Sequence, residues 1–319
     1  MIKKAFFFVL LLFLLNLHAK GQSCCSGGVP ISNSLGMPFS SKSSFQASVS
    51  YDYHNLNTLF QDKERLEDKS RERVTHTSLI QLGTVFNNGL SFETLIPYII
   101  QERKIATTIG TDIARTSGLG DVLGLVNYQK QIKYFTLSVG IGLKAPTGSI
   151  DNRNSLGILL NADLQPGTGS WDVLPVFRWV RSLKNKPNTS IYSTVIAALK
   201  GTDKEYQQGL SYKFGNEQQL TLGLSSQQYF LKSLWNTGVG LRFRNVQKNE
   251  TNGQTISSTG GRWLLLNGNI GYWLIPEKSN LTISADIPVY NGINGLQNVP
   301  TYRLNCSIYC LLNYKEKKK

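Results

Sequence analysis

Seven charged residues occupy alternate positions in segments whose other positions are mostly apolar. They carry both signs and share a face with serine, threonine, asparagine and glycine. Fixed charges at such positions can pair as internal salt bridges that keep a wall rigid, or they can line a path for a solute. The spacing alone leaves both interpretations open. The seven are Glu93, Asp121, Lys144, Arg178, Arg242, Arg244 and Asp286.

Catalytic chemistry has little support in the sequence. Beyond residue 21 the only histidines are His54 and His76, and nucleophilic catalysis usually needs a histidine fixed beside a nucleophile. The glycine-rich stretches 118–120 and 167–170 neither open a helix nor precede a lysine, so they do not indicate a phosphate-binding loop. Nothing fixes a distance between Cys24 or Cys25 and either histidine. We therefore expect no enzyme, no cofactor and no metal site.

Composition excludes two broad classes of protein. The chain has 319 residues, of which 40% are hydrophobic and 17% charged. There is no second long apolar run after the N-terminus, which excludes a helical membrane protein. Regular patterning continues along the whole length, which excludes a disordered chain. A single large all-β domain remains.

The N-terminus predicts export. Lys3 and Lys4 precede an apolar run at 5–17, which is shorter than the roughly 20 residues of a bilayer-spanning helix. Ala19 and Gly21 supply small residues at the spacing that a signal peptidase needs, so we predict cleavage before Gln22. An uncleaved anchor is the alternative.

The charge balance suits a lipid surface. Loss of the three lysines in residues 1–21 lowers the net charge from +14 to +11, and the tail 315–319 carries +3 of that. The remaining +8 suits anionic lipid or mildly anionic solutes. Nucleic acid is not an expected partner, because basic residues do not cluster with aromatic ones.

Period-two alternation recurs from residue 45 to residue 314. Apolar side chains line one face of each segment, and small polar side chains with single charges line the other. This pattern predicts 12 strands, at 45–53, 80–86, 90–100, 122–128, 137–143, 171–179, 191–199, 220–224, 239–243, 264–272, 281–289 and 304–314.

The connections between these strands alternate in length. Short ones are expected at 87–89, 129–133, 183–188, 231–235 and 276–279, and long ones at 55–76, 102–119, 145–170, 201–218, 247–260 and 291–300. A soluble sandwich also alternates, but it does not ordinarily place every long loop at one end. The sequence therefore predicts a transmembrane outer-membrane β-barrel of about 12 antiparallel strands. Its domains are a signal peptide at 1–21, a flexible segment at 22–43, the barrel at 44–314 and a basic tail at 315–319.

Five short motifs stand at the ends of the predicted strands and in the loops between them. They are Ser-Gly-Leu-Gly-Asp-Val at 117–122, Leu-Lys-Ala-Pro-Thr-Gly at 143–148, Gln-Pro-Gly-Thr-Gly-Ser at 165–170, Tyr-Lys-Phe-Gly-Asn-Glu at 212–217 and Asp-Ile-Pro-Val-Tyr at 286–290. In this order and spacing they resemble the motifs of the transporter family named for the MetA pathway of phenol degradation. The resemblance covers about residues 45–314. It implies an outer-membrane barrel that moves aromatic or other hydrophobic small molecules, and an assembly machinery as a partner.

Two functional hypotheses follow. The first is a passive channel for small hydrophobic or aromatic solutes across the outer membrane. The second is a non-conducting structural or surface-interaction barrel whose lumen is plugged by residues 22–43 or by the connection 145–170. In that connection Ile158, Leu159 and Leu160 form an apolar stretch between two turn-forming ends. We expect this stretch either to form an apolar site at the barrel mouth, where a solute enters, or to pack against neighbouring loops.

Overall fold

The computed structural model describes residues 43–313 except for residues 109, 155 and 207–208. The predicted signal peptide, almost all of the segment 22–43, and the basic tail lie outside the described residues. The described part is built from β-strands and one short 3₁₀ helix, η1 (Ala162–Leu164). None of its helices has the length and apolar character needed to cross a membrane.

A single antiparallel sheet closes into a barrel, and its circumference has 12 strand positions. Its strands are β1 (Ser44–Asn55), β4 (Arg71–Val85), β5 (Leu90–Thr107), β6 (Gly110–Leu119), β7 (Val122–Ile132), β8 (Phe135–Ala145), β9 (Asp172–Leu183), β10 (Lys186–Ala198), β13 (Glu217–Phe230), β14 (Ser233–Val246), β17 (Gly261–Ile275), β18 (Ser279–Ile293) and β20 (Tyr302–Asn313). The sheet has 13 strands, but β6 and β7 follow one another along β5 and share a position, which leaves 12. The wall closes because β1 pairs with both β4 and β20. The predicted 12-strand antiparallel barrel is confirmed.

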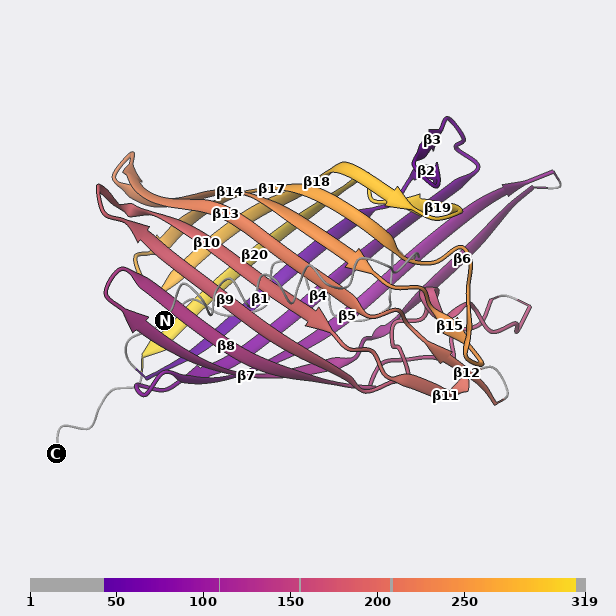
Figure 1. Cartoon of the computed structure of the whole chain (residues 1–319), viewed down its shortest axis with the longest axis horizontal. Coiled ribbons are helices and arrows are strands. Elements are labelled where there is room, and N and C mark those ends of the chain that lie inside the picture. The colour runs from indigo at the N-terminus through magenta and orange to yellow at the C-terminus, as the bar shows by residue number, and fades with distance from the viewer. Residues whose placement is uncertain (1–42, 109, 155, 207–208, 314–319) are drawn as a thin grey trace, which may run out of the picture.

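Long connections gather at one end of the barrel and tight turns at the other (Figure 1). We call these the loop end and the turn end. Short strands build the long connections: β2 (Thr58–Gln61), β3 (Glu64–Leu66), β11 (Thr202–Tyr206), β12 (Leu210–Lys213), β15 (Glu250–Thr251), β16 (Gln254–Thr255) and β19 (Leu296–Val299). At the turn end, Gly89 adopts φ +88°, and a Cβ there would lie 2.2 Å from the carbonyl oxygen of Gln129. Only glycine fits this turn.

The segment 102–119, predicted as a long loop, is a β-hairpin, and that prediction is wrong. β5 continues to Thr107 and β6 pairs with it from Gly110 onward. Ion pairs support this extension: Lys104 Nζ lies 3.2 Å from Glu102 Oε1, and Arg115 also pairs with Glu102. These charges obscure the hydrophobic alternation, because a strand beyond the bilayer has no lipid face to cover. β4 extends in the same way, beginning at Arg71 within the predicted loop 55–76.

The outer surface is apolar along the strands and aromatic towards both ends. Val49, Ile141 and Ile308, for example, are exposed on the outer face. Aromatic side chains towards the turn end include Phe86, Phe92, Tyr128, Tyr134 and Tyr229, and those towards the loop end include Tyr98, Trp171, Tyr290 and Tyr302. An apolar band between two aromatic girdles is the surface that a bilayer-embedded barrel requires.

The inner face differs from the expected polar one between β4 and β10. Buried inward-facing side chains there form an apolar cluster: Leu79, Leu95, Leu123, Leu125, Leu174, Val176, Ile196 and Ala198. Gly142 in β8 makes room for it, because a Cβ at this position would lie 3.1 Å from Leu123 and 3.2 Å from Leu174. We call this cluster the apolar wall. Apolar residues are stable inside the barrel where they pack against one another.

Candidate functional site: the lumen and its mouth

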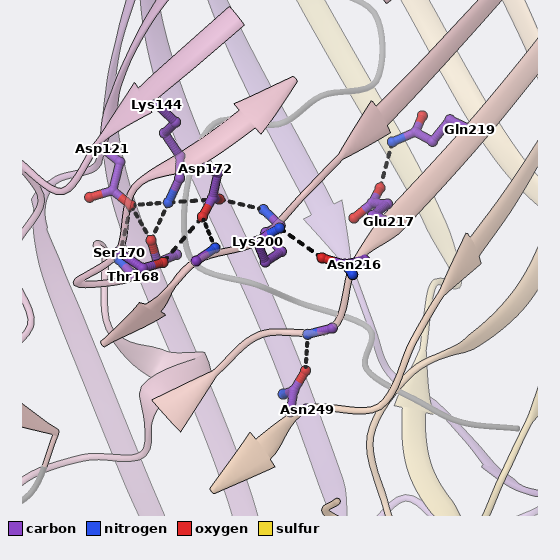
Figure 2. A network of polar contacts seen from close by, with 12 residues as sticks. Asp121, Lys144, Thr168, Ser170, Asp172, Lys200, Asn216, Glu217, Gln219 and Asn249 are labelled. Carbon is purple, nitrogen blue, oxygen red and sulfur yellow. Dashed lines mark hydrogen bonds and ion pairs between the residues drawn. The ribbon is translucent and has the colours of Figure 1, made fainter. Parts of the chain in front are cut away.

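Four charged side chains form a buried network on the inner wall near the loop end (Figure 2). Lys144 Nζ lies 2.6 Å from Asp121 Oδ2 and 3.1 Å from Asp172 Oδ2, and Lys200 Nζ lies 3.0 Å from the same Asp172 oxygen. The strand register brings them together: Lys144 faces Asp172 in the β8–β9 ladder, and Asp121 lies in the break between β6 and β7. Each buried charge therefore has a partner of opposite sign.

Asp121 also fastens both ends of the connection 146–171 between β8 and β9. Its Oδ1 accepts a hydrogen bond from the Gly148 amide at 3.0 Å, and its Oδ2 accepts bonds from the Thr168 amide at 3.0 Å and the Thr168 hydroxyl at 2.6 Å. Glycine permits this approach, because a Cβ on Gly167 would lie 2.5 Å from the Gly148 backbone. Three of the motifs that carry the family resemblance thus meet at one point.

Further ion pairs continue around the barrel. Arg242 pairs with Asp286 at 2.7 Å, Arg244 with Glu217 at 2.8 Å, and Arg303 with Asp52 at 2.8 Å. Together with the network they form what we call the charge belt: Asp52, Asp121, Lys144, Asp172, Lys200, Glu217, Arg242, Arg244, Asp286 and Arg303. The belt contains five acidic and five basic side chains, so it carries no net charge.

Of the seven charged residues predicted to line the lumen, five are buried and Arg178 and Arg244 are half-buried. The structure brings Asp121 to Lys144 and Arg242 to Asp286. Arg244 binds Glu217, which was not among the seven. The remaining two lie closer to the turn end: Glu93 accepts hydrogen bonds from Gln81 (3.0 Å) and Asn127 (3.1 Å), and its charge acts on Arg178 in β9.

Five members of the belt were missed as site residues. Asp52, Asp172 and Lys200 follow the same inward alternation as the seven, so their positions in the strands could have identified them. Glu217 and Arg303 lie just before the predicted strands 220–224 and 304–314, where the apolar pattern has not yet begun. Alternation therefore does not mark these two, although Glu217 is the last residue of the motif at 212–217.

The connection 146–171 folds into the loop end of the barrel. Leu160 and Leu164 are buried against Ala114 of β6. The Thr116 hydroxyl donates to the Leu164 carbonyl oxygen at 2.6 Å, and the Gln101 amide donates to the Gln165 carbonyl oxygen at 3.3 Å. The side chains that hold this segment therefore come from the inner faces of β5 and β6.

The three residues of the predicted apolar mouth site, Ile158, Leu159 and Leu160, lie in three different environments. Leu160 enters the barrel, whereas the Ile158 side chain is 61% exposed, and Leu159 forms an isolated bridge with Arg153. Asp163 supplies a polar anchor on the inward segment, because its Oδ2 accepts a hydrogen bond from Arg73 Nη1 at 2.5 Å.

A cavity of about 610 Å³ lies at the loop end beside this inward segment. Its lining combines arginines from β4 and β5, residues 161–163, tyrosines from β11 and β12, and polar or apolar residues from β15, β19 and the connections beside them. Pockets for small organic molecules span roughly 300–1,000 Å³. The cavity is therefore large enough for a small solute at the mouth of the barrel.

Comparison with known proteins agrees with this architecture. The family described as "Putative MetA-pathway of phenol degradation" matches residues 70–296. The crystal structure of an outer membrane channel from Pseudomonas putida F1 aligns with a TM-score of 0.68 at 15% identity, covering 89% of this chain and 100% of that one. The β domain of the Bordetella autotransporter BrkA aligns over 86% of this chain and 100% of its own, at 11% identity and a TM-score of 0.49. Among proteins of curated function, none matches the sequence.

The closed barrel with its apolar outer band is an outer-membrane fold of the kind found in channels. The protein is therefore an outer-membrane protein.

Proposed function

The chain belongs to the family of the MetA pathway of phenol degradation, and from this premise we propose that it is a passive channel for small hydrophobic or aromatic solutes. The cavity of about 610 Å³ at the loop end is the observation that carries the proposal. It opens beside a segment held inside the mouth, and the apolar wall lies further along the barrel. A solute path with apolar surface suits molecules of low polarity. The proposal gives the protein no catalytic step.

A plugged, non-conducting barrel is the second candidate. The inward segment 160–168 favours it, because this segment is fastened by Asp121, Thr116 and Arg73 and narrows the mouth. In this alternative the barrel would serve as a structural or surface-interaction protein. The two functions differ in whether ions and solutes cross.

Conductance in planar bilayers distinguishes the two candidates. We expect the wild-type protein to form small channels, and we expect deletion of residues 153–162 to raise their conductance by removing part of the narrowing segment. Leu156→Ser is the matched control, because the Leu156 side chain is 80% exposed and lies outside the barrel interior. If neither the wild type nor the deletion variant conducts while both still fold, the channel function is wrong and the structural role holds.

A further inference from the structure

The mouth cavity has an excess of positive charge on one wall. Arg71, Arg73 and Arg103 line it from β4 and β5, and Asp163 is its only acidic lining residue among those described. Asp163 is already engaged, since Arg73 Nη1 donates to it. Two positive charges therefore remain without an acidic residue in the lining.

Arg71 and Arg103 are the arginines available to a ligand. Within the described part of the chain the Arg71 guanidinium has no carboxylate within 4 Å, and the acidic group on which its charge acts, Asp68, lies in the exposed β3–β4 connection outside the cavity lining. Among the described residues Arg103 has one ion-pair partner, Asp112, at 3.7 Å, and the Asp112 side chain is 58% exposed to solvent. Arg103 Nε is buried and has no hydrogen-bond partner among the described residues. A guanidinium in this state is prepared to bind an anion, because a carboxylate matches its forked donors.

The loops after β10 and β14 give the cavity an aromatic and apolar side. The rings of Tyr206 and Tyr212 lie 4.9 Å apart, and Ile256 packs beside them. Burial raises the pKa of both tyrosines, so their hydroxyls stay neutral and add no negative charge to the cavity. An aromatic ring stacks favourably on such a surface.

We propose that this cavity binds an aromatic carboxylate, with the carboxylate on Arg71 and Arg103 and the ring against Tyr206, Tyr212 and Ile256. The assignment rests on the proposed channel function and names its substrate class. Charge alone would accept any small anion, and apolar surface alone would accept any neutral aromatic molecule. The combination of both in the lining of one cavity selects a molecule that has both parts.

Binding of benzoate to the purified full-length protein in detergent, measured by calorimetry, tests the assignment. Acetate carries the charge without the ring, and benzyl alcohol carries the ring without the charge. We expect saturable benzoate binding and at least about tenfold weaker binding of each comparator, since a charge-assisted hydrogen bond and a stacked ring each contribute on that scale. Equal binding of acetate would overturn the aromatic part, and equal binding of benzyl alcohol would overturn the anionic part.

Variants locate the site. Arg71→Gln and Arg103→Gln should each weaken benzoate binding about tenfold or more, because each removes a charged donor. Arg115→Gln is the matched control: Arg115 lies on the same β5–β6 hairpin, but its side chain is 71% exposed and pairs with Glu102 on the outer face. Benzoate affinity unchanged in Arg71→Gln and Arg103→Gln would overturn the site.

The conductance of the wild-type protein separates this proposal from the channel function. Selective benzoate binding by a protein that does not conduct would uphold the site and refute the channel. Conductance without arginine-dependent benzoate binding would uphold the channel and refute the site.

Discussion

Lys144 connects two acidic members of the charge belt, because its ammonium group contacts two buried carboxylates and the Thr168 hydroxyl. Lys144→Met would leave Asp121 without a cationic partner in the wall. Removing one partner of a buried ion pair typically costs about 3–5 kcal/mol. We expect a loss of this size in the free energy of unfolding, measured by urea titration of the purified protein in detergent.

Two variants calibrate that measurement. Lys130→Met removes an exposed lysine of β7 and should change the unfolding free energy by less than about 0.5 kcal/mol. The double variant Asp121→Asn/Lys144→Met removes both charges and should be more stable than Lys144→Met alone. An unfolding free energy for Lys144→Met equal to that of the wild type would contradict the role given to this pair.

For a single residue, the sequence predicts the face of the strand on which its side chain lies, but not the residue that the side chain contacts. Alternation assigns Asp121 and Lys144 to the same face as the other inward-pointing positions of the barrel, and both are buried. Their contact depends on the break at Gly120 and on the β7–β8 register, which sets Leu123 opposite Lys144. The β8–β9 register then brings Asp172 opposite Lys144. Period-two alternation excludes a register shift of one residue, but a shift of two keeps every side chain on the same face, so the pattern does not select the partner.

Strand β20 offers the sharpest test of the inside and outside faces. Ile308 is exposed on the outer face at mid-strand, and its neighbour Ser307 faces the lumen. Ile308→Asp puts a charge against lipid and should cost about 2–4 kcal/mol. We expect loss of the heat-modifiable gel migration that marks a folded barrel. Ser307→Asp, one residue away, should keep that migration; the opposite result would invert the assigned faces.

The strands themselves were largely predictable, but their lengths were not. The 12 alternating segments correspond to the 12 barrel positions, because lipid on one side and the lumen on the other impose period-two alternation. β4 and β5 run well past their predicted ends, through Arg71 and Arg103, and β6, which contains Arg115, lies wholly within a predicted loop. Beyond the bilayer both faces meet water, so the alternation disappears while the backbone ladder continues.

For the molecule as a whole, the segregation of long connections predicts its orientation in the membrane. Outer-membrane barrels place long loops outside the cell and short turns in the periplasm. A membrane-impermeant maleimide should therefore label Glu67→Cys, in the β3–β4 connection, on intact cells. It should label Asn185→Cys, in the β9–β10 turn, only after the cells are permeabilised. Labelling of Asn185→Cys alone on intact cells would reverse the orientation, and the wild-type protein gives the background from its native cysteines.

The sequence does not predict the mouth cavity, because the cavity depends on the fold of the whole molecule. Arg71, Arg103, Tyr206 and Ile256 come from segments spread over almost 200 residues, and only barrel closure brings them together. The apolar stretch around Leu160 did indicate a segment that avoids water. It could not indicate that Leu160 turns inward while Ile158 stays exposed, since that depends on contacts with Ala114 and Arg153.

Closure of the barrel depends on the contact between β1 and β20, which joins residues 44–55 to residues 302–313. Folding slows as contacting residues become more distant along the chain. No strand pairing among the described residues joins segments more distant than these two. Until β20 arrives, β1 and β18 each expose a row of unpaired N–H and C=O groups, and a bilayer offers these groups no hydrogen-bond partner. A partly formed sheet is therefore unstable in the hydrocarbon core of the membrane. Insertion and closure must be one concerted event, and its timing is set by the appearance of the strand that follows all the others described.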